Sequence, residues 1–194
     1  MQWAQEITER VNQVTGLQYS LFTQVLSPEV GTLVWSTFLP DLGVFEAATD
    51  KLTADDGFAA ALDDGAQYLM GGADDMLLQV LHGLQEPAGH TEYISAVRAI
   101  CADGKFAEGV AKGVSIAQRA EEITGVSTTF AMNATGDYGA VTWFTGHESI
   151  RTMEAGMQAL ASDPGWGEFL DRETAGVYLG APEATTQIIL RRVM

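Results

Sequence analysis

The sequence is poor in cysteine and has no long apolar run. Its single cysteine, Cys101, has no partner for a disulfide within the chain, so a cytoplasmic location is expected. No apolar stretch approaches the roughly 18 residues that a membrane-spanning helix needs. Residues 1–14 are polar and lack the apolar segment of a signal peptide. We therefore expect no membrane partner.

Positive charge is also scarce. Ten lysines and arginines face 26 aspartates and glutamates, which gives a formal net charge of −16. Such a chain repels phosphate backbones, so nucleic acid is not an expected partner. The acidic surface is explained by solubility. Adaptation to a salty environment is the alternative, because carboxylates stay hydrated and salt screens their mutual repulsion.

Several chemical signatures are missing. No Cys-x-x-Cys or His-x-x-x-His spacing suggests metal ligation. The sequence has no Gly-x-Ser-x-Gly segment, which is the nucleophile motif of α/β-hydrolases, so a hydrolase of that class is not predicted. The glycine pair at Gly71 and Gly72 does not join a strand to a helix, so no phosphate-binding loop is predicted. We therefore expect neither a metal nor a cofactor.

The chain contains an imperfect internal repeat. Residues near its start match residues 109 positions later, and after a one-residue deletion the shift becomes 108. A single gap over about eighty residues indicates two copies of one unit. The identical pairs include Ile7/Ile116, Arg10/Arg119, Thr15/Thr124, Gly16/Gly125, Trp35/Trp143, Glu46/Glu154, Ala47/Ala155, Asp55/Asp163 and Gln79/Gln187.

The second copy has the clearer pattern of elements. An alternating run predicts a strand from Tyr93 to Cys101, and apolar residues at helical spacing predict a helix from Phe106 to Ile123 that stops at Gly125. The remaining expected elements are strands at 126–132 and 140–145 joined by a turn at Gly136-Asp137, helices at 148–160 and 163–170, and a strand at 185–193. The order β-α-β-β-α-β is that of a ferredoxin-like unit.

These patterns predict an α+β protein made of two ferredoxin-like repeats. We expect the first repeat at residues 1–84, a linker at 85–91 and the second repeat at 92–194. Trp3 aligns with Lys112, halfway along the first helix of the second copy. The first copy therefore lacks its first strand, either because the repeat has decayed or because the true start lies further upstream.

Particular segments of the second copy resemble a known superfamily. They are Val141-Thr142-Trp143, Ser149-Ile150-Arg151 and the Asp-Pro-x-Trp-x-x-Phe-Leu stretch at 163–170. They are similar to the dimeric α+β barrel superfamily, which includes antibiotic-biosynthesis monooxygenases and NIPSNAP-like proteins. The resemblance implies two antiparallel sheets packed face to face, here supplied by one chain. Of the arginines in the family's middle helix, only Arg151 remains.

The resemblance does not extend to haem chemistry. Haem-degrading relatives use a histidine on the second helix and an asparagine on the first strand. Phe169 falls near that histidine position, and the segment from Tyr93 to Cys101 has no asparagine. Haem is therefore not an expected cofactor.

Seven residues are candidates for a functional site. His147 is the best general-base candidate because histidine titrates near neutral pH, and the pattern places it at the start of a helix, where a solvated role is the alternative. Asn133 is the candidate for holding a developing oxyanion. Candidate substrate-binding residues, each with a structural alternative, are Trp143, Trp35, Gln187, Gln79 and Thr128.

Two functions are consistent with this set. One is a cofactor-free monooxygenase or isomerase acting on a small apolar or aromatic molecule, with His147 as base, Asn133 at the oxyanion and Trp143 stacking on the substrate. The other is a non-catalytic, NIPSNAP-like protein that binds a ligand or has a structural role. An exposed sheet edge in the incomplete first copy also favours a homodimer, although the charge of −16 opposes association.

Overall fold

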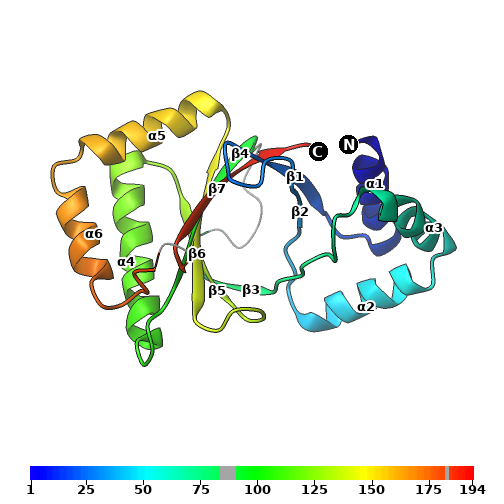
Figure 1. Cartoon of the computed structure of the whole chain (residues 1–194), viewed down its shortest axis with the longest axis horizontal. Coiled ribbons are helices and arrows are strands. Elements are labelled where there is room, and N and C mark those ends of the chain that lie inside the picture. The colour runs from blue at the N-terminus through cyan, green and yellow to red at the C-terminus, as the bar shows by residue number, and fades with distance from the viewer. Residues whose placement is uncertain (84–90, 182–183) are drawn as a thin grey trace. The chain divides into compact units, whose positions relative to one another are not determined.

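The computed structural model describes residues 1–83, 91–181 and 184–194. Its elements are shown in Figure 1. The chain divides into two compact units. The first unit consists of Met1–Gln24, Gly31–Asp75 and Arg192–Met194, and the second of Val25–Val30 and Met76–Arg191.

The second unit contains an antiparallel sheet. Its strand order is β7-β4-β6-β5-β3. Four of these strands, taken in the order β7-β4-β6-β5, have the arrangement of a ferredoxin-like unit, and β3 is added beside β5. The strands are β3 (Leu78–His82), β4 (Tyr93–Ile100), β5 (Thr128–Asn133), β6 (Ala140–His147) and β7 (Thr186–Arg192).

Three helices of the second unit lie on one face of this sheet, as Figure 1 shows. They are α4 (Phe106–Thr124), α5 (Ile150–Ser162) and α6 (Trp166–Thr174). α4 ends at Gly125, whose φ of 70° lies in the left-handed region that glycine adopts without strain. α5 begins after Ser149, which forms a capping box with Thr152.

The core of the second unit lies between the sheet and α4. Phe130 and Val141 have no exposed surface, and the ring centroids of Phe130 and Trp143 are 5.1 Å apart. Burial of each large apolar side chain contributes about 1.5–3 kcal/mol. Gly113 on α4 faces the Phe130 ring, and its missing side chain lets that ring pack against the helix backbone. This packing fixes the position of α4 over β5 and β6.

The first unit has two strands and three α-helices among its described residues. The chain opens with α1 (Gln2–Thr15), and no strand precedes this helix. β1 (Ser20–Val25) and β2 (Leu33–Ser36) form an antiparallel hairpin in which Leu21 pairs with Trp35. The remaining elements are α2 (Leu42–Thr53), α3 (Asp56–Gly65) and a short 3-10 turn, Ala66–Tyr68.

The α+β class and the order of elements in the second copy are as predicted. Several boundaries differ, and three of them have a clear cause or bear on the site. β6 continues to His147 instead of ending at 145, so His147 ends a strand and does not open a helix. The helix predicted from 148 begins at Ile150 because Ser149 is its cap. The helix predicted from 163 begins at Trp166, because the Asp163 carboxylate accepts a hydrogen bond from the Gly165 amide and forms a turn there.

One strand pairing bears on the predicted division into repeats. β3, which the repeat alignment counts in the first copy, pairs with β5 of the second unit. Residues 85–90 of the predicted linker lie outside the described residues. The duplication, the domain limits and the face-to-face packing of two sheets stay predictions.

Candidate functional site

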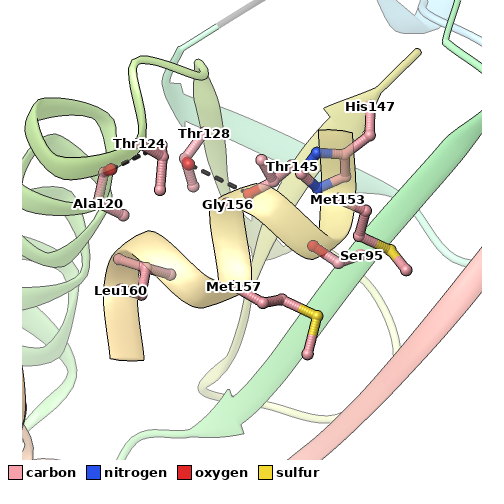
Figure 2. Close-up of a pocket in the computed structure, with 10 residues that line it drawn as sticks. All are labelled: Ser95, Ala120, Thr124, Thr128, Thr145, His147, Met153, Gly156, Met157 and Leu160. Atoms are coloured by element: carbon pink, nitrogen blue, oxygen red, sulfur yellow. Dashed lines mark hydrogen bonds between the residues drawn. The ribbon is translucent and has the colours of Figure 1, made fainter. Parts of the chain in front are cut away.

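A small cavity lies in the second unit between the sheet and helices α4 and α5 (Figure 2). Its volume is about 60 Å³, enough for a few water-sized groups. The polar groups at its sheet side come from Ser95, Thr128, Thr145 and His147. The helices contribute Ala120, Thr124, Met153, Gly156, Met157 and Leu160. No lining side chain except His147 is ionisable between pH 4 and 9.

His147 is the last residue of β6 and pairs with Tyr93. Only 7% of its surface is exposed, and its Nδ1 atom is buried without a hydrogen-bond partner among the described residues. Burial lowers the pKa of His147 below its usual value of 6.5, because the charged imidazolium is poorly solvated there. The ring is therefore neutral at pH 7. A neutral imidazole with an unused nitrogen can accept a proton.

Three neighbouring strands each carry a hydroxyl side chain near His147, in line with Thr145, which stands two residues before it on β6. Thr145 is opposite Thr128 on β5 and opposite Ser95 on β4. The hydroxyl oxygens of Thr128 and Thr145 are 3.1 Å apart, which is a hydrogen-bond distance. Side chains two residues apart on a strand share a face, so Thr145 and His147 point into the same cavity, as Figure 2 shows. These hydroxyls can donate to an oxygen that gains negative charge.

Glu121 on α4 supports this row of hydroxyls from outside the cavity. One of its carboxylate oxygens accepts from the Thr128 amide at 2.8 Å and from the Ser127 hydroxyl. The other lies 3.3 Å from Nε2 of His82. Burial opposes ionisation of Glu121, but the hydrogen bonds from the Thr128 amide and from His82 outweigh it and lower the pKa. Glu121 therefore stays charged and fixes the start of β5.

Asn133 does not lie near His147. Met132 pairs with Val141, so Asn133 follows at the far end of the β5–β6 pairing. His147 follows Val141 by six residue steps along β6, a distance of about 20 Å. The Asn133 amide nitrogen donates to the sulfur of Met76 at 3.1 Å, and its Oδ1 atom is buried without a partner among the described residues. One substrate atom cannot contact both side chains.

The two predicted tryptophans lie outside the cavity. Trp143 is 9% exposed and belongs to the core, and its indole nitrogen donates to the Gly113 carbonyl at 2.8 Å. Trp35 lies in the first unit, is 36% exposed and donates to the Thr8 hydroxyl at 2.7 Å. Both indoles are therefore held by hydrogen bonds within their own units.

The two glutamines are exposed, Gln79 on β3 and Gln187 on β7. Neither lines the cavity. Of the seven predicted residues, the structure brings together His147 and Thr128 alone. Met153, Met157 and Leu160 recur at helical spacing in the sequence, but this spacing does not reveal that a cavity lies beneath them.

Comparison with known proteins gives the fold. No family model matches the chain, and no curated protein matches it. A protein named as a putative monooxygenase from Fusobacterium nucleatum superposes over 98% of this chain and 85% of its own, with 10% identity and a TM-score of 0.64. An anthrone oxidase-like protein superposes over 99% of this chain and 85% of its own, with 14% identity and a TM-score of 0.64. The chain shares the α+β fold of these two proteins.

A NIPSNAP-like domain protein from Burkholderia xenovorans superposes over 53% of this chain and 85% of its own, with 14% identity and a TM-score of 0.40. None of the helices in 1–83, 91–181 and 184–194 is long and apolar enough to cross a membrane. The same residues contain no group of three or more His, Cys, Asp or Glu side chains placed to hold a metal ion.

A shallow groove lies along α5 in the second unit. It is lined by Ile150, Met153, Glu154, Met157, Gln158 and Ala161. Met153 and Met157 belong to both the groove and the cavity, and Met157 is 53% exposed. Methionine side chains are flexible and adapt to apolar surfaces of different shape. The two methionines therefore form the boundary between the groove and the cavity.

Proposed function

We propose that the protein is a cofactor-independent monooxygenase or isomerase that removes a proton from a small apolar or aromatic substrate. The observation that supports this most is the buried, neutral imidazole of His147, with Nδ1 unpartnered beside a row of hydroxyls. Proton abstraction requires a base that is neutral at the working pH and within reach of the substrate.

In the proposed reaction His147 takes a proton from a carbon that is next to a carbonyl group or conjugated with one through an aromatic ring, as the methylene carbon of anthrone is. The electron pair of the broken C–H bond moves to the carbonyl oxygen and forms an enolate. The hydroxyl of Thr128, Thr145 or Ser95 donates to this oxygen and stabilises its charge. Asn133 has no part in this scheme because the β5–β6 register places it at the other end of the sheet.

The enolate then follows one of two routes. In an isomerase His147 returns the proton to a different carbon, so the net composition does not change. In an oxygenase the carbanion carbon reduces dioxygen and forms a C–O bond. With anthrone as the probe, the balanced result is anthrone plus O₂ giving anthraquinone plus water: the methylene carbon is oxidised to a carbonyl and one oxygen atom leaves as water.

The size of the cavity limits what enters it. About 60 Å³ admits the reacting end of a substrate and not a whole aromatic ring system. We propose that the apolar body lies in the groove of α5 and that Met153 and Met157 move to connect groove and cavity. The apolar lining of both regions suits an aromatic or aliphatic substrate.

The test is aerobic turnover of anthrone, followed by anthraquinone absorbance and by oxygen consumption. We expect His147→Gln to lower kcat by about 10²–10⁴-fold, the usual contribution of a general base. Gln187→Ala is the matched control, because Gln187 is exposed on β7 and outside the cavity. If wild-type and His147→Gln protein convert anthrone at the same rate, His147 is not the base.

A non-catalytic ligand-binding or structural role is the second candidate. It is favoured by the lack of a second ionisable group among the cavity-lining residues. Native mass spectrometry of protein purified from its host separates the two proposals. A retained apolar molecule, together with no turnover of any probe, would support the binding role.

We also propose that the protein forms a homodimer. Within the first unit, β2 pairs with β1 on one side, and a strand edge invites pairing with another chain. Light scattering at high salt, where repulsion between the acidic chains is screened, measures the mass. The mass of one chain under those conditions would exclude the dimer.

A further inference from the structure

Gly156 occupies an unusual position in α5. It is buried in the middle of the helix and lines the cavity beside His147. Glycine within a helix destabilises it relative to alanine, because the unfolded chain has more freedom to lose. A buried glycine in such a place is expected where a side chain would clash with a neighbour.

The other two buried helix glycines of the second unit fit that expectation. A Cβ atom on Gly113 would overlap the ring of Phe130, and one on Gly109 would overlap the sulfur of Cys101. Both contacts lie in the closely packed core, so packing requires glycine at these positions.

Packing does not require glycine at position 156. A Cβ atom there would lie 3.8 Å from Cε1 of His147 and 4.0 Å from Cγ2 of Thr124, which are ordinary van der Waals distances. Its φ is not in the left-handed region, so alanine would fit the backbone as well. The side chain would occupy part of the cavity next to the imidazole ring.

In the first copy of the repeat, an alanine stands at the position that matches Gly156. Ala48 stands 108 residues before Gly156 and is 4% exposed, and Leu39 stands 108 residues before His147. The copy without the histidine thus also has the additional methyl group. The histidine and the glycine occur together in one copy, and leucine and alanine stand at the matching positions of the other.

We propose that Gly156 is a specificity-determining residue of the His147 site. Its missing side chain reserves the space in which a carbonyl or enol group of a few non-hydrogen atoms approaches the imidazole. A substrate with a further group on its reacting carbon or oxygen should therefore react more slowly than one without it. This inference rests on the proposed function of His147 as a base.

Gly156→Ala tests the proposal, with Gly167→Ala as the matched control. Gly167 lies in α6, where a Cβ atom would have no neighbour within 4 Å. Two readouts do not depend on activity. One is the Tm. The other is the change that xenon causes in the methyl NMR signals of Met153 and Met157, because xenon enters apolar cavities.

We expect Gly156→Ala to raise the Tm and to abolish the xenon-induced shifts of both methionines. Its kcat/KM for anthrone should fall at least about tenfold, in the range by which one methyl group alters discrimination. Gly167→Ala should keep the xenon shifts and keep kcat/KM within about twofold.

Two results would overturn the proposal. One is a Gly156→Ala protein that keeps the xenon-induced shifts. The other is a Gly156→Ala protein that loses them but converts anthrone as fast as wild type. Failure of the proposed function is distinguishable, because the wild-type protein would then bind xenon at Met153 and Met157 without oxidising anthrone. In that case the xenon shifts of Gly156→Ala still decide whether Gly156 keeps the cavity open.

Discussion

Arg10 donates hydrogen bonds to both carboxylate oxygens of Asp55, at 2.9 Å and 2.6 Å. Arg119, which stands 109 residues later, contacts both oxygens of Asp163 at 3.3 Å and 3.1 Å. Each aspartate also accepts from a backbone amide at the start of the following short helix, from Phe58 or from Gly165. The same ion pair thus joins a long helix to the same turn in both units, which supports the duplication hypothesis.

The Arg10–Asp55 pair gives a prediction on stability. The hydrogen bond from Arg10 is the main cause of the lowered pKa of Asp55, with burial opposing it and the Phe58 amide assisting. Asp55→Ala removes both the ion pair and the helix cap and should lower the Tm by about 2–4 °C. Asp55→Asn keeps an oxygen for the Phe58 amide and should lower it less.

Thermal unfolding followed by circular dichroism measures both changes, and Asp56→Asn is the control because Asp56 lies in the first turn of α3 next to the cap. A Tm for Asp55→Ala equal to that of the Asp56 control would contradict the prediction.

His147 gives a prediction on pH dependence. Its folded-state pKa is below 6.5 because of burial, so below pH 6.5 the unfolded chain binds more protons than the folded protein. The free energy of unfolding therefore falls as the pH is lowered from 6.5 towards the folded-state pKa, and this contribution is constant above 6.5. The comparison variant is His147→Leu, because leucine does not titrate and is the residue at the matching position 39 of the first copy.

Urea denaturation of wild type and His147→Leu between pH 5 and 8 measures the effect. We expect wild type to lose stability relative to His147→Leu as the pH falls below 6.5. Parallel pH profiles for the two proteins would show that His147 is solvated in the folded state.

The two tryptophans should respond differently to substitution by phenylalanine. Trp143→Phe leaves the Gly113 carbonyl without its donor and opens a gap in the core, so we expect a loss of about 1–3 kcal/mol. Trp35→Phe should cost under about 1 kcal/mol, because the indole is partly exposed and the Thr8 hydroxyl keeps its own bond to the Ala4 carbonyl. Urea denaturation measures both. Equal losses of unfolding free energy in the two variants would contradict the prediction. They would mean that the deeper burial of Trp143 and its hydrogen bond to the Gly113 carbonyl add no stability.

Gly113→Ala should be destabilising, unlike Gly156→Ala. The added methyl group would overlap the Phe130 ring, which is fully buried and has no room to retreat. Overpacking of this kind costs about 1–3 kcal/mol. A Tm above that of wild type for Gly113→Ala would show that α4 can move away from β5.

The sequence predicted those parts of the fold that depend on local signals. Apolar spacing along α4 and the left-handed Gly125 at its end gave that helix within a residue, and Gly136-Asp137 gave the β5–β6 turn. Pairing of β3 with β5 joins segments about fifty residues apart, and no local pattern encodes it. The exact starts of α5 and α6 depend on side-chain caps that propensity alone does not reveal.

For the candidate site, the sequence identified His147 but not the residues around it. The sequence held a signal that Asn133 and His147 lie apart: a hairpin turn at 136–137 sets a register in which Asn133 lies beside Ala140, at the opposite end of β6 from His147. The same register places Thr128 beside Thr145, a residue that the sequence did not single out. The role of Gly156 was not visible, because a missing side chain matters only once its neighbours are known.

The position of β3 has a consequence for any attempt to express the two halves of the gene separately. A fragment starting at residue 92 would follow the apparent repeat boundary, yet it would lack the strand that pairs with β5. The backbone amides and carbonyls of Phe130–Asn133 on that side would then face water or another molecule, and exposed strand edges of this kind pair with other chains and aggregate. A fragment beginning before Leu78 keeps the strand. Insolubility of the shorter fragment would therefore reflect where it was cut and not an inability of the second repeat to fold.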